Sequence, residues 1–83
     1  MADPVSWKVV ESGWEVVASD GDSVGTVREV LGDAEADIFS GLVVSEGLLS
    51  KTRFVPSEQV TRIDAGVVHL ALDAASFAQL DET

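Results

Sequence analysis

The stretch GWEVVASDGDSVGTVREV at residues 13–30 decides the fold class of this chain. It contains two short runs rich in alternating or β-branched residues, and the pair Asp20-Gly21 stands between them. Because glycine adopts positive φ without steric cost, an Asp-Gly pair in this position predicts a tight turn. A second glycine, Gly25, lies just inside the second run, where we expect a bulge or a sharp bend. The segment therefore predicts a β-hairpin.

Further short strands are expected on both sides of this hairpin. Pro56 should end a strand, because proline has no amide hydrogen to donate to a ladder. The pair Ala65-Gly66 separates two runs that predict a second hairpin. The run Gly41-Leu42-Val43-Val44 has no polar position, so we expect it to be buried on both faces. The expected strands are 7–10 (an edge strand), 14–18, 23–31, 37–45, 51–55, 60–64 and 67–72.

The segment 73–80 predicts a short helix over one end of the β structure. Asp73 is suited to cap its N-terminus, and Phe77 and Leu80 share one face at i, i+3. Many short strands with turn signals between them are typical of a sandwich or a barrel. Glycines inside strands favour the strong bending that barrel closure requires. We therefore expect a small barrel in a single domain at 7–80, between a flexible N-terminal tail at 1–6 and a C-terminal tail at 81–83.

The charge balance limits the partners of this chain. Its 83 residues include 15 Asp and Glu against five Lys and Arg, for a net charge of −10. Nucleic acids and anionic membrane surfaces attract clustered basic residues, whereas the basic residues here are scattered. No apolar run approaches the ~20 residues that span a bilayer. We expect no nucleic-acid partner and no membrane insertion. The acidity is compatible with solubility alone, with a basic partner and with a high-salt cytoplasm.

Cysteine usage and the first residues bear on compartment. The chain has no cysteine, so it offers neither a disulfide framework nor a thiolate metal site. The opening Met-Ala-Asp-Pro has no basic or apolar region typical of a secretory signal. We therefore expect a cytoplasmic protein.

Two phrases of the sequence resemble a known family. Segment 16–30 contains a hydrophobic pair, then Ser-Asp-Gly, Gly-Thr-Val and Glu-Val, and Arg53-Phe54-Val55-Pro56 is followed by the strand pattern at 67–72. These are similar to the opening hairpin and the second half of PRC-barrel domains, which are named after the photosynthetic reaction-centre H subunit. Such domains also occur at the C-terminus of a ribosome maturation factor. The resemblance covers about 13–72 and is closest to stand-alone bacterial members without an assigned function.

The resemblance implies an all-β fold, a six-stranded, partly open β-barrel, that often self-associates and acts by binding other proteins. It implies no catalytic residues and no cofactor. The maturation factor's N-terminal domain and a membrane helix are both missing from this sequence, so we do not expect the ribosomal or photosynthetic roles to transfer. We predict a non-enzymatic protein-interaction or adaptor module that binds a protein partner, forms homodimers, or does both.

Four apolar residues are the candidates for partner binding. Tryptophan is favoured at interface hot spots, which singles out Trp7. Adjacent leucines in a loop are hard to bury together, so Leu48 and Leu49 either plug an end of the barrel or form an apolar patch that a partner covers. Phe54 and an open strand edge complete the expected surface. By contrast, we assign Asp20, Gly21, Gly25 and Pro56 to turns and bends.

Acidic residues provide the alternative function. Carboxylates could hold a divalent cation or a small ligand through oxygen atoms. The sequence lacks the twelve-residue Ca²⁺ loop, so we interpret these carboxylates as turn residues and assign no metal ligand. The five residues concerned are Asp20, Asp22, Asp33, Glu35 and Asp37. His69, the single histidine, lies on the outward phase of its strand, and we assign no catalytic residue.

Overall fold

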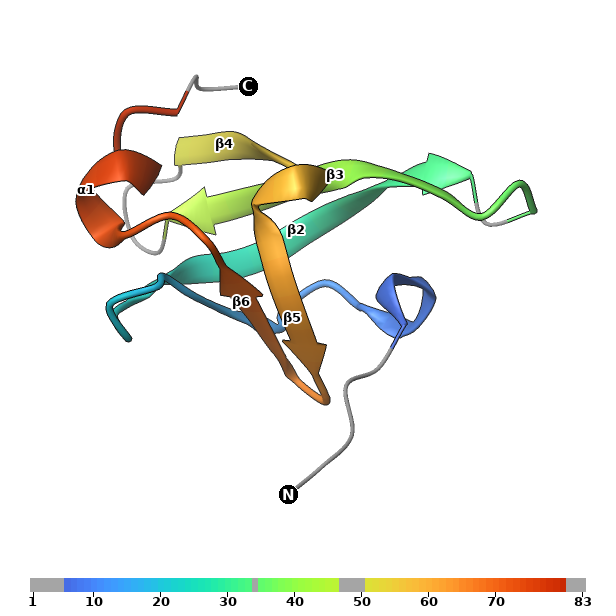
Figure 1. Cartoon of the computed structure of the whole chain (residues 1–83), viewed down its shortest axis with the longest axis horizontal. Coiled ribbons are helices and arrows are strands. Elements are labelled where there is room, and N and C mark those ends of the chain that lie inside the picture. The colour runs from blue at the N-terminus through green and yellow to red at the C-terminus, as the bar shows by residue number, and fades with distance from the viewer. Residues whose placement is uncertain (1–5, 34, 47–50, 81–83) are drawn as a thin grey trace.

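Six strands and three short helical segments make up the part of the fold that the structure describes. The computed structural model describes residues 6–33, 35–46 and 51–80 (Figure 1). The elements in chain order are η1 (Trp7–Val9), β1 (Glu15–Val17), β2 (Ser23–Asp33), β3 (Ile38–Glu46), β4 (Lys51–Pro56), η3 (Ser57–Gln59), β5 (Val60–Asp64), β6 (Val67–Leu70) and α1 (Ala74–Phe77).

The six strands form one curved sheet in the order β4-β3-β2-β1-β6-β5. Neighbours pair antiparallel, except that β1 and β6 run parallel. The hairpin of β5 and β6 crosses the long β2 and β3 strands (Figure 1). In the part of the chain that the structure describes, β4 and β5 lie at the two ends of the order and do not pair with each other. The sheet is therefore not closed, and the expected all-β, partly open barrel with one short helix is confirmed.

The first hairpin bends where the sequence places Gly25. The ladder between β1 and β2 shifts register there: Val16 lies opposite Gly25, but Val17 lies opposite Ser23. Val24 is therefore the extra residue of a bulge. A Cβ atom on Gly25 would collide with the carbonyl oxygen of Ser45 on β3. Only glycine lets the strands approach this closely, and the approach fixes the bend.

Valine and leucine side chains from all parts of the sheet fill the core. The run 41–44 is buried at every position, as the sequence predicts. α1 lies beside the end of the sheet where β3 finishes and β4 begins (Figure 1), and its Phe77 is 1% exposed. Asp73 caps this helix, since its Oδ1 accepts a hydrogen bond of 2.7 Å from the amide of Ser76. The largest fully buried side chains are Phe77, Leu42, Leu70, Val16, Val27, Val44, Val55 and Val68.

Two expectations about local structure were wrong. Segment 7–10 is not an edge strand: residues Trp7–Val9 form a 3-10 helix. Ser6, the last residue of the expected tail, caps it by accepting a hydrogen bond of 3.2 Å from the amide of Lys8. The interval between the expected strands 23–31 and 37–45 is not entirely a loop, because β2 continues to Asp33 and pairs there with Ile38. The first difference arises from contacts of Trp7 with residues that are distant in sequence, and the second from pairing within the β2–β3 hairpin.

Candidate protein-binding site

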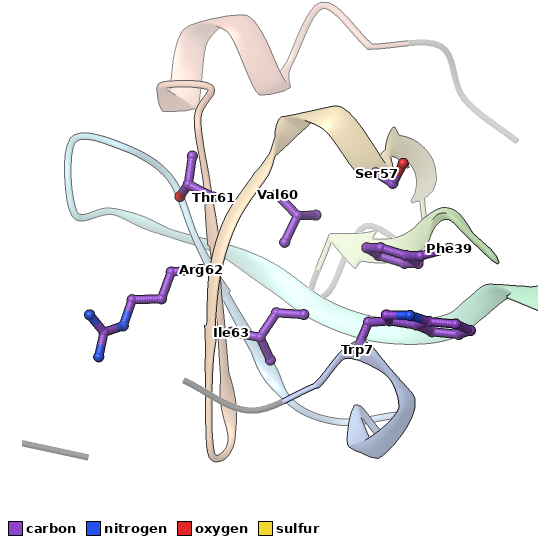
Figure 2. A pocket seen from close by; sticks show the side chains of 7 residues that line it. All are labelled: Trp7, Phe39, Ser57, Val60, Thr61, Arg62 and Ile63. Atoms are coloured by element: carbon purple, nitrogen blue, oxygen red, sulfur yellow. The ribbon is translucent and has the colours of Figure 1, made fainter. Parts of the chain in front are cut away.

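A shallow groove of about 280 Å³, lined by both apolar and polar residues, lies on the open side of the barrel. The rings of Trp7 from η1 and Phe39 from β3 form one wall, and β5 forms the other, with Ser57 of η3 at one end. The two rings stack, with centroids 5.2 Å apart and an interplanar angle of 10°. Figure 2 shows them lying face to face, with Val60 and Ile63 pointing toward them.

An irregularity in β5 gives the groove its second wall. The ladder between β5 and β6 shifts register between Val60 and Arg62. In a regular strand, residues three apart face opposite sides, but the shift places Val60 and Ile63 on the same side. Thr61 and Arg62 also line the groove, but their side chains extend to the other side of the β5 ribbon from Val60 and Ile63 (Figure 2). The bulge therefore adds a second apolar side chain to the wall.

Carboxylates of the β2–β3 turn hold Trp7 in place. Asp37 Oδ1 accepts a hydrogen bond of 3.3 Å from Trp7 Nε1, and the Lys8 Nζ lies 3.4 Å from the same oxygen. Asp37 has a φ of 57°, in the left-handed region where aspartate is tolerated better than most residues. Asp33 Oδ1 stabilises the turn by accepting hydrogen bonds from the amides of Glu35 (3.0 Å) and Ala36 (3.3 Å). These side chains therefore shape the turn that anchors the tryptophan.

The backbone of β5 is open along the groove. Among the described strands, β5 pairs only with β6. Asp64 and Val67 flank the two-residue turn of this hairpin, so they form a hydrogen-bonded pair. Pairs alternate along an antiparallel ladder, which directs the N–H and C=O groups of Ile63 away from β6. An unpaired strand edge beside an apolar groove is the arrangement that accepts an added strand.

The structure places two of the four candidate partner-binding residues. Trp7 lines the groove. Phe54 is half-buried on β4, where its ring covers Gly41: a Cβ atom on that glycine would lie 2.7 Å from the ring. Phe54 therefore packs on a neighbouring strand and does not line the groove. Leu48 and Leu49 lie outside the described residues.

Of the seven groove residues, sequence reasoning singled out only Trp7, and the apolar ones that it missed are Phe39, Val60 and Ile63. Phe39 falls in a predicted strand, and nothing local indicates that it stacks on a tryptophan far away in sequence. Val60 and Ile63 did carry a signal. Apolar residues at i, i+3 within a short strand break the two-residue alternation and indicate a bulge.

The acidic residues take part in turns and caps. Asp20 accepts hydrogen bonds from the amides of Asp22 (3.3 Å) and Ala74 (3.4 Å), so it links the first hairpin turn to the start of α1. Within residues 6–33, 35–46 and 51–80, no three histidine or carboxylate side chains gather in a way that could hold a metal ion. The cation-binding alternative therefore gains no support from the geometry.

His69 belongs to a small polar cluster on the outer face of the second hairpin. Its Nε2 lies 3.0 Å from Asp64 Oδ2, and Asp64 Oδ1 accepts a hydrogen bond of 2.8 Å from Arg62 Nε. This bond from Arg62 is the main cause that lowers the pKa of Asp64 below its ordinary value of 3.8. No described hydroxyl group hydrogen-bonds to the His69 ring. The cluster thus holds a base and a carboxylate that orients it, without a nucleophile beside them.

Comparison with known proteins agrees with this architecture. Across the described residues, no helix is long and apolar enough to cross a membrane. No curated protein matches the sequence. The family model of the PRC-barrel domain matches residues 12–76, from the segment before β1 into α1. PRC-barrel domains are generally non-catalytic. Because this match spans well over half of the sequence, the chain belongs to the PRC-barrel domain family.

Proposed function

We propose that this chain is a non-enzymatic module that binds other protein chains, its own copies included, along the open side of the barrel. The observation that carries the proposal is the unpaired edge of β5 beside the groove lined by Trp7 and Phe39. Main-chain hydrogen bonds to such an edge supply affinity, and the neighbouring pocket selects side chains.

The same edge is suited to pairing between copies. Two β5 strands related by a two-fold axis run antiparallel, so each one would extend the sheet of the other. The apolar wall of the groove would lose solvent on pairing, which adds a hydrophobic contribution to the hydrogen bonds. Self-association is therefore part of the proposal.

The test compares two threonines that are both exposed and both on strands. Thr61 lies on β5, which is open on one side, whereas Thr26 lies on β2, which is paired on both sides. A lysine on an edge strand disfavours strand addition. We expect Thr61→Lys to weaken self-association in sedimentation velocity and to reduce capture of partner chains from the native host. We expect Thr26→Lys to behave as the wild type.

One combination of results would contradict the proposal. A wild-type chain that stays monomeric at every concentration, and that captures the same proteins as Thr61→Lys, would remove the proposal. Thermal melts of both variants must first show folded proteins. A melt of the wild type in millimolar Ca²⁺ or Mg²⁺ tests the cation alternative, because a ligand that binds only the native state raises the midpoint.

A further inference from the structure

We infer that the groove takes an extended, basic peptide segment of a partner protein, which adds as a strand to β5 and inserts an apolar side chain beside Trp7 and Phe39. The inference rests on the proposed function and names its partner class. It follows from three features of the described residues: the dimensions of the edge, the charge of the rim and the aromatic wall.

The edge and the groove fit an extended segment. β5 contains five residues, so a segment of similar length can pair along it. In an added strand, successive side chains point to opposite faces. Every second residue of the segment would therefore face the apolar wall of Val60, Ile63 and the two rings, and the remaining residues would face the solvent and the rim.

The segments that border the groove, here called its rim, carry more acidic than basic residues; these segments are η1, the β2–β3 turn, η3 and β5. Their five carboxylates are Asp33, Glu35, Asp37, Glu58 and Asp64. Asp37 bonds to Trp7 in the lining, whereas Asp64 belongs to the polar cluster on the outer face of the hairpin. The two cations of these segments, Lys8 and Arg62, lie 3.4 Å from Asp37 and 2.8 Å from Asp64, respectively. In the described part of the chain, no cation pairs with Asp33, Glu35 or Glu58. A basic segment is therefore attracted to this rim.

Charge also separates the two classes of occupant. A second copy of this chain has the same net charge of −10, so two copies repel each other, most strongly at low salt. Low salt therefore strengthens the binding of a basic segment and weakens the binding of a second copy. The stacked rings act in the same direction, because the faces of tryptophan and phenylalanine attract lysine and arginine side chains.

The aromatic wall is partly outside the family match. Trp7 precedes residues 12–76, which the family model covers, whereas Phe39 and β5 lie within them. The tryptophan that completes the groove therefore belongs to a segment of this chain that the PRC-barrel model does not describe. The inferred specificity is a property of this chain rather than one implied by the family.

The probe is a synthetic peptide of sequence Lys-Val-Lys-Phe-Lys-Val-Lys, added to the full chain labelled for NMR. We expect shifts at the amides of β5 and at the indole N–H of Trp7, and a Kd that weakens at least about tenfold between low and high salt. Two further peptides carry N-methyl groups on either the odd or the even amides. Strand addition predicts that only one of these two loses binding, because alternate amides face β5.

Matched variants test the groove itself. We expect Trp7→Ala and Phe39→Ala each to weaken the peptide about tenfold, since each removes an aromatic contact of the inserted side chain. Ile38→Ser is the control, because Ile38 is exposed, precedes Phe39 and does not line the groove. Its affinity for the peptide should equal that of the wild type.

Four results would overturn the inference. They are equal binding of a peptide with glutamate in place of lysine, equal binding of both N-methylated peptides, shifts that map away from β5, and no binding at all. Sedimentation separates this failure from failure of the proposed function. If Thr61→Lys abolishes self-association while the basic peptide does not bind, the face belongs to a second copy and the proposed function stands. If neither the peptide nor a copy binds and capture is unchanged, both fail.

Discussion

The two sides of this barrel use their strand edges in opposite ways. β3 is paired with β2 on one side and with β4 on the other, and its run 41–44 is buried at every position. Among the described strands, β5 pairs with β6 alone, and Ile63 is the single buried residue among its five. Packing therefore uses both backbone edges of β3 and the apolar surface of its run 41–44. On β5 one backbone edge stays unpaired among the described strands and Val60 is only partly buried, which is what a binding surface needs.

The largest expected effect comes from truncating one apolar side chain on each side. Leu42 is 0% exposed, and Leu42→Ala should lower the free energy of unfolding by about 3 kcal/mol, because it leaves a cavity. Val60 is only partly buried, and Val60→Ala should cost about 1 kcal/mol. Urea denaturation measures both. Equal losses would mean that the groove wall is part of the core and not a free surface.

Glycine substitutions extend the comparison to the backbone. A Cβ atom on Gly41 would collide with the carbonyl oxygen of Val55 and approach the Phe54 ring, so Gly41→Ala should cost about 2 kcal/mol. Gly66, in the turn of the β5–β6 hairpin, has a φ of 84° and open space around it. Gly66→Ala should cost about 1 kcal/mol, from the left-handed backbone alone. Urea midpoints in the reverse order would contradict the close strand contact at Gly41.

The sequence predicts the tightly packed side better than the open one. The alternation at 14–18, the Asp-Gly turn and Gly25 each act locally, so the β1–β2 hairpin can be read from its own residues. The apolar run 41–44 likewise indicates its own burial. These signals are enough for the class of fold and for most strand positions.

Contacts between segments decide the rest. The residue types at 7–10 are compatible with a strand and with a helical turn. What fixes η1 includes the hydrogen bond from Trp7 to Asp37, 30 residues away in sequence, and the stack on Phe39. The continuation of β2 to Asp33 depends instead on a nearby residue, because Asp33 pairs with Ile38 across the β2–β3 turn. Trp7 could be singled out from its residue type, but the position of Phe39 beside it depends on how the sheet curves.

Two arginines test the polar contacts on each side. Arg53 donates from Nε to Glu46 Oε2 at 3.0 Å and from a guanidinium nitrogen to the carbonyl oxygen of Leu80 at 2.6 Å. Its side chain is 11% exposed, so Arg53→Met should cost about 2 kcal/mol by leaving Glu46 without this partner. Arg62 is 39% exposed, and Arg62→Met should cost clearly less. Urea denaturation measures the free energy of unfolding of both variants. Equal losses would contradict the difference in burial between the two arginines.

The smallest expected effect is on pH dependence, and it concerns the β5–β6 hairpin and α1. A hydrogen bond from Arg62 lowers the pKa of Asp64, with a smaller contribution from His69, and the backbone amide of Ser76 lowers the pKa of Asp73. A carboxyl whose folded-state pKa is depressed stabilises the fold above its unfolded pKa, and this contribution is lost as the pH falls through the folded value. We therefore expect the melting temperature to be steady above about pH 5. It should decrease once the pH falls below 3.8, the ordinary pKa of both carboxyls.

The location of the acid effect is the sharper test. Protonation of Asp64 removes a contact within the β5–β6 hairpin, and protonation of Asp73 removes the cap of α1. Below pH 4, hydrogen exchange should therefore rise in β5, β6 and α1 before it rises in β3. The double variant Asp64→Asn, Asp73→Asn should melt lower than the wild type at neutral pH and lose less on acidification. If exchange rose first in β3, acid would act on the packed side, and the division of the barrel into a saturated and an open side would not hold.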